Sequence, residues 1–170
     1  ASDVYKRQVF THERFQVESE LRLFVNPLDG VALACLTLKN HSGMERMMEV
    51  CSYLEPALAS QRDDAAHPAF QNLFVRTGRL GKYGVAAMRR PRDPSGESRR
   101  LWHLMATDAS LTMLRVQTDR AAFLGRGRTI YAPRALEMPI SAVADTLGDV
   151  IEPCLSLRGQ FVLPPGGRLQ

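Results

Sequence analysis

Alternating hydrophobic and polar positions dominate the first third of the chain. In residues 17–25, valine or leucine fills every second position except Ser19, and the residues between them are mostly charged. A period of two predicts a half-buried β-strand. After a turn at 26–30, residues 31–38 are apolar on both faces, which is typical of a covered central strand. Residues 47–54 predict a third strand, and we expect these three strands to form a meander.

The pattern changes at 59–71 and again at 90–100. Both stretches are polar, so we expect two loops there, the second at the tip of a hairpin. Five further strands are predicted at 73–77, 85–88, 101–106, 114–118 and 155–163. The last of these alternates leucine and phenylalanine with Ser156, Arg158 and Gln160, which predicts one polar face.

One short helical turn is expected among the strands. Asp119 stands where an N-cap residue would begin a turn over 120–124, and Gly125 stands where it would end. Residues 126–149 show no regular pattern. About eight strands, closely spaced turns and no long amphipathic helix predict an all-β fold, an antiparallel β-sandwich with short helical turns in its loops.

The length and the two ends bear on domain organisation. A chain of 170 residues is typical of one domain. Residues 1–8 begin without methionine and resemble a translated adaptor, so we treat them as non-native and assign the sandwich to 9–170. The Pro-Gly turn at 165–166 predicts a following strand, and we expect the domain to be truncated at its C-terminal end.

Composition narrows the functional classes. Hydrophobic residues make up 45% and charged residues 24%, as in a globular protein. The net charge of +4 is spread along the chain without long basic blocks, which argues against a nucleic-acid partner. The three cysteines are odd in number and not closely spaced, so we expect reduced thiols in a cytoplasmic setting. The first ten residues lack the apolar segment of a signal peptide.

Standard catalytic signatures are absent from the sequence. It holds no Gly-x-Ser-x-Gly, no Walker loop and no His-Glu-x-x-His. The four histidines are far apart and lack metal-ligand spacing, so no metal site is expected. We therefore assign no catalytic residue and no cofactor to this chain.

Two short segments carry groups suited to a polar ligand. His67, Gln71 and Asn72 supply imidazole and amide groups, which can bind sugar hydroxyls or serve as loop hydrogen bonds. We expect Phe70 and Phe74 in the same segment to enter the core. Farther on, Arg126 and Arg128 alternate with glycines, and their planar guanidinium groups can hold a phosphate or a sugar.

Several ordered segments together resemble the amino-terminal sandwich of the cellobiose and chitobiose phosphorylase family. The first are 20–25, 36–42 and 52–55. Segments 66–75, 89–92 and 118–128 are more similar to the version found in cyclic beta-1,2-glucan synthases. The resemblance covers about residues 10–163.

The resemblance implies a non-catalytic role. In that family the sandwich is part of a supersandwich that precedes an (α/α) barrel, and the barrel carries the aspartate that acts as general acid. Inorganic phosphate, the co-substrate, attacks the anomeric carbon with inversion, by a logic that parallels inverting glycosidases. Some members carry a sugar-binding arginine where this chain has Gln71-Asn72.

The resemblance also implies partners and a location. The expected partners are a β-glucan oligosaccharide or polysaccharide, the barrel domain of the parent chain and a second copy in a homodimer. The parent enzyme would lie in the inner membrane, with this region on the cytoplasmic side. The leading interpretation is a sandwich domain that shapes the glucan cleft and supports dimer contacts.

Two other interpretations remain open. A stand-alone carbohydrate-binding module would need an exposed aromatic platform, for which Trp102 and Tyr131 are the candidates. Because Trp102 falls in a predicted strand, we expect it in the core. A nucleic-acid binder would show strongly salt-dependent binding.

Overall fold

The computed structural model describes residues 8–26, 28–91, 96 and 98–170. Residues 1–7 of the adaptor-like segment 1–8, and residues 92–95 and 97 of the predicted hairpin tip, lie outside the described residues. The chain divides into two compact units. Unit 1 comprises residues 1–48, 107–111 and 161–170, and unit 2 comprises 49–106 and 112–160.

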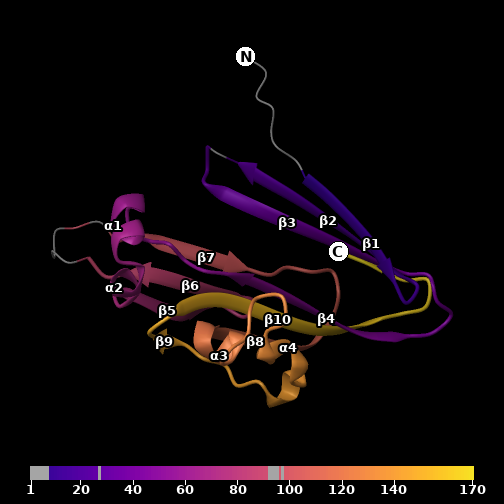
Figure 1. Cartoon of the computed structure of the whole chain (residues 1–170). Helices are drawn as coiled ribbons and strands as arrows, with labels where there is room; N and C mark the ends of the chain where they lie inside the picture. The colour runs from indigo at the N-terminus through magenta and orange to yellow at the C-terminus, as the bar shows by residue number, and fades with distance from the viewer. Residues whose placement is uncertain (1–7, 27, 92–95, 97) are drawn as a thin grey trace. The chain divides into compact units, whose positions relative to one another are not determined.

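Unit 1 contains one four-stranded sheet with the order β1-β2-β3-β11 (Figure 1). Its strands are β1 (Gln8–Arg14), β2 (Val17–Asn26), β3 (Val31–Asn40) and β11 (Arg168–Leu169). The strands β2 and β3 confirm the period-two predictions. β1 was not predicted as a strand. The short β11 follows the Pro-Gly turn, after which a strand was expected, and it pairs with β3. The β1–β2 turn places Phe15 and Gln16 at positive φ, as a tight two-residue hairpin turn requires.

Asn40 is a buried polar junction of unit 1. Its side-chain amide donates to the carbonyl oxygens of Met44 at 2.8 Å and Pro164 at 3.0 Å. Its Oδ1 accepts from the backbone N–H of Ser42 at 3.0 Å and from the Ser42 hydroxyl at 2.6 Å. These bonds satisfy a fully buried amide and fix the turn after β3 to the segment after Leu163.

The second sheet has the order β4-β10-β8. It consists of β4 (Arg46–Leu54), β10 (Pro153–Leu163) and β8 (Leu111–Asp119). The predicted meander is therefore wrong in its third member, because β4 pairs with β10 and not with β3. Hydrogen-bonded pairing between strands distant in sequence is a tertiary property that strand periodicity does not encode.

The third sheet lies in unit 2 and has the order β7-β6-β5-β9. Its strands are β7 (Arg100–Leu104), β6 (Gly84–Arg89), β5 (Val75–Leu80) and β9 (Gly148–Asp149). A core of buried side chains fills the space between this sheet and β4-β10-β8. Its members are Leu58, Val75, Val85, Ala87, Val116, Leu155 and Leu157. The all-β sandwich prediction is confirmed.

Helices cover the opposite face of β4-β10-β8. They are α3 (Arg120–Leu124) and α4 (Arg134–Glu137), and a 3₁₀ turn, η1 (Ile140–Ala142), follows them. Phe123 and Leu124 of α3 pack with Ala135 and with Cys154 of β10. Unit 2 thus has three layers, a helical layer and two sheets, and the β10 strand of the middle sheet is buried on both faces.

Burial on both faces changes the expectation for β10. The predicted polar face is not solvated, because Ser156 and Arg158 are buried and Arg158 is only 6% exposed. The Arg158 guanidinium donates to the carbonyl oxygens of Ala135 at 2.6 Å and Met138 at 2.9 Å and pairs with Glu49. A polar residue on this strand therefore binds the helical layer instead of water.

The cysteines agree with the expectation of reduced thiols. Cys35, Cys51 and Cys154 are all free, and Cys154 is fully buried. Burial raises the pKa of the Cys154 thiol to about 12, so the thiolate is suppressed at neutral pH.

Candidate functional site

The segment 59–71, predicted as a polar loop, forms two short helices. They are α1 (Gln61–Ala66) and α2 (Pro68–Asn72), and they lie beside the β5–β7 sheet of unit 2 (Figure 1). The Ser60 hydroxyl caps α1 by accepting from the Asp63 N–H at 3.1 Å, and Pro68 occupies the first turn of α2. Ser60 as an N-cap and Pro68 in a first helical turn are both local signals for the start of a helix. The sequence prediction assigned a loop because the segment is polar. We call residues 60–72, the two helices with the Ser60 cap, the α1–α2 corner.

The three predicted sugar-binding residues of the α1–α2 corner differ in exposure. His67 joins the two helices and is exposed, and Asn72 ends α2 and is half-buried. Gln71 is buried, and both its backbone oxygen and its Oε1 accept from the Arg89 guanidinium, at 3.1 and 2.5 Å. Gln71 therefore fixes α2 to β6, while His67 and Asn72 remain accessible to a ligand.

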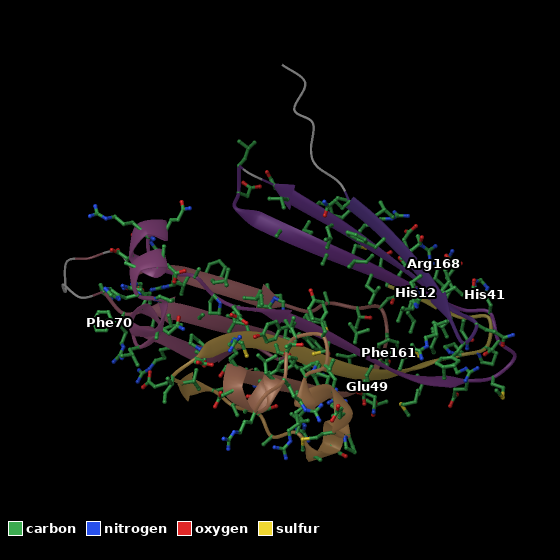
Figure 2. The ribbon with its side chains drawn as sticks, in the orientation of Figure 1. His12, His41, Glu49, Phe70, Phe161 and Arg168 are labelled. Atoms are coloured by element: carbon green, nitrogen blue, oxygen red, sulfur yellow. The ribbon has the colours of Figure 1, made fainter. Side chains whose placement is uncertain are left out.

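Phe70 is not in the core as predicted. It is 49% exposed and projects from α2, as Figure 2 shows. Its ring meets Phe74 edge to face at 5.3 Å, and the Arg89 guanidinium lies over Phe74. These two rings therefore contact each other edge to face at the margin of the core, with Phe74 half-buried and Phe70 exposed.

The second predicted pair, Arg126 and Arg128, lies in the turn after α3. Both side chains are exposed, and Arg128 forms an ion pair with Glu137 of α4. The hydrogen bond from Arg128 holds the pKa of Glu137 below its usual value. Within the described ranges, no hydrogen bond or ion pair joins this turn to the α1–α2 corner, so the structure does not bring the two predicted groups together.

A serine–histidine contact in unit 2 was not predicted. Ser52 Oγ and His103 Nε2 are 2.7 Å apart, and Ser52 also donates to the Leu157 carbonyl at 3.2 Å. Because the serine hydrogen is used in that second bond, we assign Nε2–H of His103 as the donor to Ser52. This is the reverse of the arrangement in which histidine acts as a general base toward serine.

A second unpredicted cluster joins two glutamates to one arginine. Arg120 donates to Glu55 at 2.8 Å and to Glu152 at 3.2 Å, and Tyr53 donates to Glu55 at 2.6 Å. Burial raises the pKa of Glu55, but the hydrogen bonds from Tyr53 and Arg120 outweigh it and leave that pKa lowered. Glu55 is thus held ionised and paired, and this cluster fixes α3 to the end of β4 without supplying a carboxylic acid at Glu55.

The part of the chain that the structure describes contains no cluster of three metal-ligating side chains. None of its helices, over the same residues, is long and apolar enough to cross a membrane.

The fold defines the class of protein as an all-β domain of antiparallel sheets, two of which pack as a sandwich in unit 2. The chain belongs to the supersandwich-domain family of glycosyl hydrolase 94, whose family model matches residues 5–170. It is also 33% identical over 135 residues to the cyclic beta-(1,2)-glucan synthase NdvB of Rhizobium meliloti (strain 1021). That match covers 78% of this chain and 5% of the relative, so the chain corresponds to a small part of that protein. The predicted resemblance to this family is confirmed.

Proposed function

We propose that this chain is the non-catalytic sandwich domain of a glycoside phosphorylase-like enzyme of the cyclic glucan synthase type. The observation that carries the proposal is the family match over nearly the whole chain. In this role the domain shapes a glucan cleft and supports contacts in a homodimer. The parent's (α/α) barrel supplies the general acid, inorganic phosphate is its co-substrate, and the region works on the cytoplasmic side of the inner membrane.

The α1–α2 corner is the segment we assign to the cleft. His67 and Asn72 are accessible, and imidazole and amide groups can each donate to and accept from sugar hydroxyls. Two hydrogen bonds from Arg89 to Gln71 hold α2 on β6, so the His67 and Asn72 side chains are carried by an ordered helix. Positioned donors and acceptors lose less entropy when a sugar binds.

The test uses the parent enzyme, in which this domain is joined to its barrel. His67→Ala and Asn72→Ala each remove one hydrogen bond, worth about 1 kcal/mol, and should raise the KM for β-glucan about fivefold. The value of kcat should stay within about twofold, because a contact made equally in the ground and transition states affects binding alone. Phosphate-dependent release of sugar 1-phosphate is the measurement, and Glu13→Ala, an exposed residue of β1 outside the corner, is the surface control.

Two results would contradict the proposal. If neither variant changes the KM for glucan, the assignment of the α1–α2 corner to the cleft is wrong. If the isolated chain releases sugar 1-phosphate by itself, the non-catalytic role is wrong.

A further inference from the structure

The outer face of the β7-β6-β5-β9 sheet carries an exposed tryptophan. Antiparallel register aligns three rows across β5, β6 and β7, and residues of one row share a face. The rows on the outer face are Arg76–Met88–Arg100, Gly78–Ala86–Trp102 and Leu80–Gly84–Leu104. We call this surface the Trp102 face.

Trp102 is 64% exposed, which contradicts the expectation that it packs in the core. The intervening row, with Thr77 and Ala87, is the one that points into the sandwich core. The Trp102 face therefore lies on the side of the sheet away from that core. The exposure of Trp102 therefore does not arise from incomplete packing of the sandwich core.

The middle row forms a hollow beside the indole. Gly78 and Ala86 are the small neighbours of Trp102, and the hollow has a volume of about 360 Å³. A Cβ atom on Gly78 would meet nothing within 4 Å, whereas one on Gly84 would lie 2.7 Å from Leu104 Cδ2. The backbone at Gly78 is therefore open beside Trp102, whereas the neighbouring row at Gly84 is covered by the Leu104 side chain.

Arginines line the hollow, but most of their charge is compensated. Arg76 donates two hydrogen bonds to Asp149, at 3.1 and 3.0 Å, and Arg79 pairs with Asp145. Arg100 has no ion-pair partner among the described residues, so its guanidinium can donate to a ligand. With one uncompensated cation, the surface lacks the positive groove that tracks a phosphate backbone.

These features fit a neutral sugar chain. The apolar C–H face of a pyranose ring can stack on an indole, whose N–H and the Arg100 guanidinium can donate to ring hydroxyls. A volume of about 360 Å³ falls at the lower end of the range for small-ligand pockets, about 300–1,000 Å³. The geometry points to the Trp102 face as a binding site for a β-glucan segment, with one sugar ring stacked on Trp102. The choice of glucan as the sugar rests on the proposed function.

The test uses Trp102 as its own reporter, because it is the single tryptophan of the chain. Titration of the purified chain with a linear β-1,2-glucan oligosaccharide should produce a saturable change in tryptophan fluorescence. Gly78→Val places a side chain in the hollow at a strand position without positive φ, and it should weaken binding at least tenfold while the fold is kept. Gly43→Val, also in open space and without positive φ, is the matched control and should bind normally.

Calorimetry extends the test to variants that remove the reporter or the donor. Trp102→Ala should abolish binding, and Arg100→Gln should weaken it severalfold, with unchanged circular dichroism. The inference is overturned if folded protein gives no saturable change at millimolar glucan, or if Gly78→Val binds as well as Gly43→Val. It is also overturned if single-stranded DNA causes the same change in a salt-sensitive manner, or if the fluorescence shifts with protein concentration alone.

The two proposals can fail separately. Loss of glucan binding in Gly78→Val concerns the isolated chain, whereas the KM effects of His67→Ala and Asn72→Ala concern the parent enzyme. A chain that binds no glucan, in a parent whose KM responds to the α1–α2 corner, refutes this inference and leaves the proposed function intact.

Discussion

At the scale of single residues, Arg158 shows how a buried charge can hold two layers together. Its guanidinium reaches Glu49 on β4 and two carbonyl oxygens around α4, so one side chain binds the middle sheet to the helical layer. Because Arg158 is buried, none of these partners is readily replaced by water. The contribution of Arg158 to stability is the free energy that would be lost if these buried acceptors had no donor.

Arg158→Ala should lower the free energy of unfolding by about 3 kcal/mol, because it leaves the carbonyl oxygens of Ala135 and Met138 without this donor and removes one of the partners of Glu49. Urea unfolding followed by circular dichroism measures the change. Arg76→Ala is the matched control, since Arg76 also pairs with an aspartate but is exposed. Water screens an exposed pair, so Arg76→Ala should change stability much less, and equal losses in the two variants would contradict the structural role of Arg158.

His103 is a second residue whose burial has a measurable consequence. Burial lowers the pKa of the His103 imidazole, so the unfolded chain binds a proton at this group more readily than the folded chain. Stability from this group is present above the unfolded pKa of about 6.5 and is lost as the pH falls below it.

The expected outcome is a lower free energy of unfolding at pH 5.5 than at pH 7.5, with a smaller difference in His103→Gln. Urea unfolding of both proteins at the two pH values tests this. Carboxylates with lowered pKa values, such as Glu55, titrate mainly at lower pH and are common to both proteins. Identical pH dependence in the two proteins would rule out His103 as the source.

At the scale of elements, α3 is the part that local sequence predicts best. Asp119 accepts from the Ala122 N–H at 3.1 Å, and Gly125 ends the helix with φ of 82°, as predicted. Both signals are local, because a cap needs only residues within one turn. The glycine has a further tertiary role, since a Cβ there would lie 2.8 Å from the Cβ of Arg134.

Removal of these end signals should have unequal effects. Asp119→Ala should cost about 1 kcal/mol, the usual value of an N-cap. Gly125→Ala should cost more than Gly127→Ala, since both glycines have positive φ but only the first would meet Arg134. Thermal unfolding of the three variants ranks their losses of stability. Equal losses for Gly125→Ala and Gly127→Ala would show that Arg134 can move away from the new Cβ atom without lowering stability.

At the scale of the whole molecule, the described residues form three sheets divided between two units, and this organisation accounts for most of the corrected expectations. Periodicity predicted β2, β3, β4 and β10 closely, but not which sheet each would join. The polar face of β10 was expected to differ from its apolar face but is also buried, and Trp102 was expected in the core but is exposed. Burial depends on what packs over a face, and for Arg158 that is a helix about 20 residues away in sequence.

The candidate site shows the same division. The sequence indicated His67, Gln71 and Asn72 by residue type, and the structure separates the buried Gln71 from its two accessible neighbours. The sequence did not indicate the hollow beside Trp102, because its floor consists of Gly78 and Ala86, two residues with no chemical signature of their own.

The sequence by itself determined the strand periods, the caps of α3 and the family. These depend on side-chain alternation, on contacts within one helical turn and on ordered motifs, all of which can be read along the chain. Only the tertiary structure decided that β4 pairs with β10, that Arg158 is buried and that Trp102 is exposed. Those outcomes depend on which distant segments cover each face of a sheet, and a strand has the same period of two whichever face is covered.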